Sequence, residues 1–140
     1  MPRFFLAAAA AVVAVFAFTA RPADATAAST AKDACVKLFE RQRTCTDQFI
    51  PALVDLRVSV DKPKGIAAEG TKPGGRDSLI KKALEEWKND STDASIDSLC
   101  TRMSSSPKAA TLEPITAQCV PSADCSAFVK CVIPMMKPTL

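Results

Sequence analysis

Six cysteines are the residues of this chain whose type and spacing carry the clearest chemistry: Cys35, Cys45, Cys100, Cys119, Cys125 and Cys131. Thiols can bind metal ions, exchange electrons or form disulfides. A zinc or redox site usually contains Cys-x-x-Cys or combines cysteine with histidine, and this sequence has neither. An even number of cysteines is typical of a disulfide framework in small exported chains. The sequence therefore predicts three disulfides and no metal ligands.

The residue sets that most enzymes need are missing. Without histidine, neither a Ser-His-Asp nor a Cys-His arrangement can form. The glycine-rich stretch 72–76 lacks the spacing and the Lys-Ser/Thr pair of a phosphate-binding loop. We therefore expect no catalytic residues, no cofactor and no enzymatic activity.

Carboxylates are the remaining candidates for chemistry. Asp55 and Arg57 flank an apolar stripe, and we expect them to form a partly buried structural pair. The other neighbouring acids, which we expect on solvated helix faces, are Glu85 with Glu86 and Asp90 with Asp93. A small hydrolytic factor would have to depend on Glu85 or Asp55.

Residues 1–25 have the parts of a secretory signal peptide. Arg3 precedes an apolar run over 4–18, and the segment closes with Ala23-Asp24-Ala25. Cleavage near Ala25 is predicted, with an uncleaved membrane anchor as the alternative. Cleavage would remove two arginines and one aspartate, which lowers the net charge from +3 to +2. So small and mixed a charge argues against nucleic acid as a partner.

Helical periodicity dominates the exported part, residues 26–140. Apolar residues recur in steps of three and four from Cys35 to Leu56, with one polar exception at Gln42. Pro51 either kinks this helix or begins a second one. Residues 52–60 alternate as a strand would, but no second strand is available to pair with them, so we expect a helix.

The remaining segments complete the domain organisation. We expect a flexible N-terminus over 26–32 and one cysteine-rich domain over 33–140. All four glycines fall in 61–75, which predicts a long loop, either an idle connector or a functional one. Further helices are expected over 77–89, from 93, around 114–118 and from 121. Trp87, the only tryptophan, is expected to anchor the core rather than serve as a ligand platform. The predicted fold is all-α, a small disulfide-stapled bundle of four to five helices.

Helix geometry restricts the disulfide pairing. Ten residues of helix place Cys35 and Cys45 about 15 Å apart, and six place Cys125 and Cys131 about 9 Å apart. Both separations exceed what a disulfide spans. An antiparallel alignment of the two ends of the domain predicts the pairs Cys35–Cys131, Cys45–Cys119 and Cys100–Cys125. The alternative replaces the last two by Cys45–Cys125 and Cys100–Cys119.

Three stretches carry a resemblance to small exported cysteine-rich proteins of myxobacterial-type bacteria. They are residues 45–57 (CTDQFIPALVDLR), Glu85-Glu86-Trp87 and residues 125–131 (CSAFVKC). That group has no assigned function, so the resemblance implies compartment and architecture only. The Cys-x9-Cys spacing over 35–45 is also similar to that of helical-hairpin proteins with paired Cys-x9-Cys motifs, although the second segment here is Cys-x5-Cys-x5-Cys. That similarity implies helices stapled side by side.

Together these features predict an exported protein, periplasmic or extracellular, that binds an unknown protein or small ligand. One alternative is an extracellular inhibitory or small hydrolytic factor. Another is a structural component of the cell envelope. Contact with a membrane is expected only through an uncleaved leader.

Overall fold

The computed structural model describes residues 22–139, which contain helices and no strand. The all-α class is therefore confirmed, although these residues divide into seven α-helices and a short 3-10 helix rather than four or five. The elements are α1 (Pro22–Thr44), α2 (Thr46–Ser59), α3 (Ile66–Gly70), α4 (Gly75–Asp90), α5 (Asp93–Ser104), α6 (Ala109–Cys119), α7 (Cys125–Met136) and η1 (Lys137–Thr139). Most of the predicted signal peptide, residues 1–21, lies outside the described residues.

The first helix begins earlier than the sequence suggested. Residues 26–32, which were expected to be flexible, are helical and belong to α1. Alanine, the strongest helix former, supplies much of this stretch. Tertiary contacts add to that propensity, because Ala31 is buried and Lys32 forms an ion pair with Asp97 at 2.7 Å.

The chain turns between α1 and α2 at Cys45, six residues before Pro51. Cys45 has non-helical backbone angles and precedes Thr46, whose hydroxyl donates to the Arg43 carbonyl oxygen at 2.7 Å. Pro51 lies inside α2. The predicted helix over 52–60 is confirmed up to Ser59, where α2 ends.

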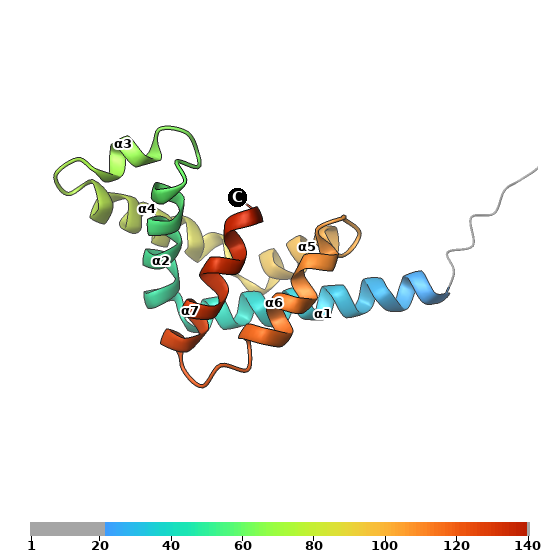
Figure 1. Cartoon of the computed structure of the whole chain (residues 1–140). Helices are drawn as coiled ribbons and strands as arrows, with labels where there is room; N and C mark the ends of the chain where they lie inside the picture. Colours follow the sequence, from blue (N-terminus) through green and yellow to red (C-terminus); the bar gives the residue numbers. More distant parts are fainter. Residues whose placement is uncertain (1–21, 140) are drawn as a thin grey trace, which may run out of the picture.

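The helices form two groups that meet at this turn (Figure 1). The helix α1 packs chiefly against α5 and α6, whereas α2 packs chiefly against α4 and α7. In Figure 1, α2 leaves the end of α1 at a steep angle, with α3 at the far end of the arm that α2 and α4 build. The helix α7 also contacts α6, so it connects the two groups.

A single apolar core lies where the groups join. Its largest fully buried side chains include Phe49 of α2, together with Phe128 and Val132 of α7. The two phenylalanine rings lie 6.4 Å apart in a tilted arrangement, which aromatic pairs favour. The guanidinium of Arg41 lies 5.7 Å from the centre of the Phe128 ring and donates from Nη2 to the Ser122 carbonyl oxygen at 2.9 Å.

All six cysteines form disulfides, as predicted, but the predicted pairing is wrong. The bonds join Cys35 to Cys100, Cys45 to Cys125, and Cys119 to Cys131. None of the pairs Cys35–Cys131, Cys45–Cys119 and Cys100–Cys125 forms. Only Cys45–Cys125 appeared in the alternative. Two physical reasons explain the error: α5 lies along α1, and α6 and α7 fold into a hairpin that brings Cys119 and Cys131 together.

The glycine-rich segment 61–75 is more structured than a plain loop. It contains α3, and the Asp61 carboxylate accepts hydrogen bonds from the backbone N–H groups of Gly65 and Ala67 at 2.8 and 3.0 Å. Gly70 packs against Val58 so closely that a Cβ there would lie 3.0 Å from a valine methyl carbon. At Gly75 an added Cβ would collide with the Glu69 carbonyl oxygen.

Substituting Gly75 by alanine is therefore expected to lower the free energy of unfolding by about 2 kcal/mol, because backbone atoms must move to admit the methyl group. The matched control is Gly65→Ala. Gly65 has a φ of +95° and open space around it, so that change should cost only about 1 kcal/mol of backbone strain. Both changes restrict the unfolded chain equally. Urea unfolding of the oxidised proteins measures both, and equal costs would contradict the steric explanation.

Candidate functional site

A pocket of about 810 Å³ lies between the two groups of helices. Binding pockets for small molecules commonly have volumes of about 300–1,000 Å³. On each helix the lining residues recur at steps of three and four, so they lie on one face of that helix. The pocket is therefore formed by the apolar faces of amphipathic helices. The lining residues that carry the argument are Phe39, Gln42, Phe49, Leu53, Trp87 and Leu99.

Aromatic rings form one wall of the pocket. The ring of Trp87 stacks on Phe39 at 6.2 Å and lies 6.0 Å from Phe49. Its Nε1 donates a hydrogen bond to the Thr46 hydroxyl at 2.9 Å, which fixes the orientation of the indole. Trp87 is half-buried and packs against the core, as predicted, and it also lines the pocket. Core anchoring and exposure to the pocket are therefore not exclusive at this residue.

Gln42 is the polar exception on the apolar face of α1, and it lines the same pocket. Its relative exposure is only 3%. No hydrogen bond joins its side-chain amide to another described residue. The amide atoms are not among the fully buried atoms that lack a partner, so they remain accessible from the pocket. Gln42 thus gives the pocket a donor and an acceptor that the described protein atoms leave unused.

Charged side chains line other parts of the pocket. They are Arg57, Glu86, Asp90, Arg102 and Lys108, and none of them takes part in an ion pair among the described residues. The helices α2 and α4 run antiparallel, since Thr46 contacts Trp87 and Asp55 contacts Arg76. Arg57 therefore lies toward the opposite end of this helix pair from the two acids.

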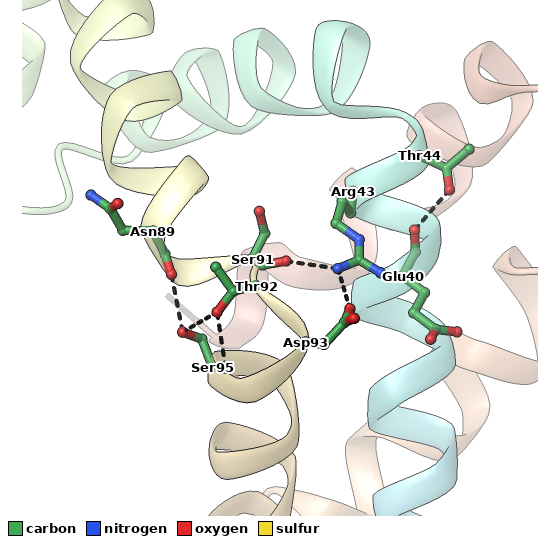
Figure 2. A network of polar contacts seen from close by, with 8 residues as sticks. All are labelled: Glu40, Arg43, Thr44, Asn89, Ser91, Thr92, Asp93 and Ser95. Carbon is green, nitrogen blue, oxygen red and sulfur yellow. Dashed lines mark hydrogen bonds and ion pairs between the residues drawn. The ribbon is translucent and has the colours of Figure 1, made fainter.

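The turn between α4 and α5 is held against the end of α1 by a polar network (Figure 2). The Nη1 atom of Arg43 donates to the Ser91 carbonyl oxygen at 3.0 Å and to the Asp93 carboxylate at 2.6 Å. The Thr92 hydroxyl oxygen caps α5 by accepting from the Ser95 backbone N–H, and the Ser95 hydroxyl donates to the Asn89 carbonyl oxygen at 3.0 Å. This network places Trp87 and the pocket-facing side of α5 relative to α1.

The carboxylates singled out from the sequence are dispersed. Asp55 does not pair with Arg57: it is exposed and accepts two hydrogen bonds from Arg76, at 2.7 and 2.8 Å. The expectation of a partly buried pair with Arg57 is wrong, because Asp55 faces α4 and Arg57 faces the pocket. The hydrogen bonds that Arg76 donates to the Asp55 carboxylate raise the pKa of Arg76. Glu85 is exposed and, like Asp55, does not line the pocket.

The acids do not gather into a cluster. Asp93 pairs with Arg43, while Glu86 and Asp90 line the pocket. Within residues 22–139, no group of three or more His, Cys, Asp or Glu side chains is placed to hold a metal ion. No helix in the same stretch is long and apolar enough to cross a membrane. The glycine-rich segment 61–75 contributes no residue to the pocket wall.

The pocket was not predicted from the sequence, although one signal pointed to it. Gln42 interrupts an otherwise apolar stripe, and a buried polar residue is more informative than an exposed apolar one. Locating the pocket also requires knowing which helices face each other, and that depends on contacts between distant segments. Comparison of the chain with family models, curated proteins and solved structures found no match.

Proposed function

We propose that this chain is an exported binding protein whose pocket holds a small, mainly apolar molecule. The observation that carries the proposal is the pocket itself, with an aromatic wall formed by Phe39, Phe49 and Trp87. Ligand sites typically combine such apolar linings with a few polar groups that orient the ligand. Gln42 is a polar group of this kind.

The disulfides support a pocket that is formed before the ligand arrives. Cys35–Cys100 joins α1 to α5, Cys45–Cys125 joins the α1–α2 turn to α7, and Cys119–Cys131 joins α6 to α7. Of the helices that line the pocket, only α4 lacks a link to this covalent framework. A preformed site loses less conformational entropy when it binds.

Export is the second part of the proposal. Three disulfides suit an oxidising environment such as the periplasm or the cell exterior. The leader over residues 1–25 predicts the same destination. The resemblance to exported bacterial cysteine-rich proteins remains an expectation, and it gives no information about the identity of the ligand.

The uncharged fluorescent dye N-phenyl-1-naphthylamine tests the binding function, because its emission rises in apolar surroundings. We expect saturable, one-to-one binding to the oxidised wild-type protein. Ala94 lines the pocket, and Ala94→Phe should fill part of it and weaken dye binding about tenfold. Such a loss corresponds to about 1.4 kcal/mol.

The matched control is Ala110→Phe. Ala94 and Ala110 are both exposed and each is the second residue of its helix, but Ala110 lies outside the pocket. Ala110→Phe should change dye affinity less than twofold. If the wild-type protein bound no dye, or if the two variants behaved alike, the pocket would not be the binding site.

A further inference from the structure

The side-chain amide of Gln42 carries information about the chemistry of the ligand. Gln42 as a residue is only 3% exposed, it lines the pocket, and its amide makes no hydrogen bond to another described residue. The amide atoms of Gln42 are not fully buried, so solvent reaches them in the empty protein. A ligand that displaces this solvent must itself supply a hydrogen bond, because a polar group buried without one is unfavourable.

The surroundings of Gln42 restrict which ligand group could satisfy it. Leu38 and Phe39 lie one turn earlier on the same face of α1, and both line the pocket. A charged group placed there would lose its hydration and gain only a neutral amide in exchange. Burial of an ion without a counter-ion is strongly unfavourable. An uncharged hydroxyl, carbonyl or amide group avoids that cost and can still bond to Gln42.

We propose that Gln42 selects ligands that combine an apolar ring or chain with one uncharged hydrogen-bonding group. This inference rests on the proposed binding function and adds the class of ligand to it. The ligand's polar group bonds to the Gln42 amide, while its apolar part contacts Phe39 and Trp87. An ionised group belongs instead beside Arg57, Arg102 and Lys108, which line the pocket and form no ion pair with another described residue.

Three probes share one ring skeleton and differ in their polar group: naphthalene has none, 2-naphthol has an uncharged hydroxyl, and 2-naphthoate has an ionised carboxylate. Their affinities are measured at neutral pH by displacement of N-phenyl-1-naphthylamine from the oxidised protein. The wild-type protein should bind 2-naphthol about tenfold more tightly than naphthalene, which is the effect of one hydrogen bond. It should bind 2-naphthoate more weakly than 2-naphthol, because naphthoate is ionised.

Gln42→Leu should weaken 2-naphthol binding about tenfold and leave naphthalene binding within twofold. Because the Gln42 amide makes no hydrogen bond to another described residue, its removal breaks none, and the midpoint of thermal unfolding of the empty protein should change little. Gln42→Met gives a second apolar variant with an unbranched chain, in case leucine packs poorly. The matched control is Gln118→Leu, since Gln118 is exposed on α6 and lies outside the pocket.

The outcomes distinguish this inference from the proposed function. If naphthalene and 2-naphthol bound to the pocket but Gln42→Leu and Gln42→Met kept the preference for 2-naphthol, the role of Gln42 would be wrong and the binding function would stand. The same conclusion would follow if 2-naphthoate bound most tightly. If none of the three probes displaced the dye, and the dye itself did not bind, the binding function would fail and the inference with it.

Discussion

Replacing both Cys45 and Cys125 by alanine is expected to lower the free energy of unfolding by about 4 kcal/mol. This disulfide spans 80 residues, the longest separation of the three. In the chain-entropy description, a longer loop restricts the unfolded state more and stabilises the folded state more. The bond also joins the α1–α2 turn to α7, and Cys45 is buried in the core. Chemical denaturation monitored by circular dichroism measures the effect.

The control for this prediction is the double replacement of Cys119 and Cys131. That disulfide spans only 12 residues, so its loss should cost about 3 kcal/mol on the same basis. Both variants remove two sulfurs, which keeps the comparison matched in composition. If losing the short link destabilised the protein more than losing the long one, local packing would outweigh the entropy of the unfolded chain.

Phe128→Ala is expected to lower the free energy of unfolding by about 4 kcal/mol. Phe128 has no exposed surface and packs against Phe49 in the centre of the core. Removing a fully buried ring loses its transfer free energy and leaves a cavity. Arg41 adds to the cost, because its guanidinium packs against the ring. Urea unfolding of the oxidised variant gives the value.

Phe128→Leu is the control, because it keeps an apolar side chain in the core and should cost about half as much. The aromatic contribution can be separated with Arg41→Met, alone and combined with Phe128→Leu. If the guanidinium and the ring attract each other, the two changes should combine to less than the sum of their separate costs. A cost below 1 kcal/mol for Phe128→Ala would contradict the central position of this ring.

Local patterns in the sequence predicted the α-helices of the described residues except α3, which lies in the segment expected to be a loop. The three- and four-residue spacing from Cys35 to Leu56 identified helical structure, and the absence of a pairing strand correctly outweighed the alternation over residues 52–60. The even number of cysteines predicted that all of them form disulfides. These features depend on residues close together in the chain or on composition alone.

Features that depend on distant segments were not predictable in the same way. The predicted disulfide pairing assumed that the two ends of the domain lie antiparallel, and it left α5 out of account. The helix α5 lies along α1 and provides Cys100, the partner of Cys35. The pocket requires six helices to be placed correctly, and the sequence specifies that placement through packing rather than through a motif. The position of Gln42 was visible in the sequence, but only the structure shows that it lines a pocket without a hydrogen bond to another described residue.

The order of the disulfides along the chain also determines how the protein responds to proteolysis. A single cut between Cys45 and Cys100 leaves one piece with Cys35 and Cys45, and another with their partners Cys100 and Cys125. Two covalent bonds then still join the fragments. The arm built by α2, α3 and α4 falls entirely within this interval. A nick in the arm therefore converts the protein into a covalent two-chain molecule, and its fragments separate only after reduction.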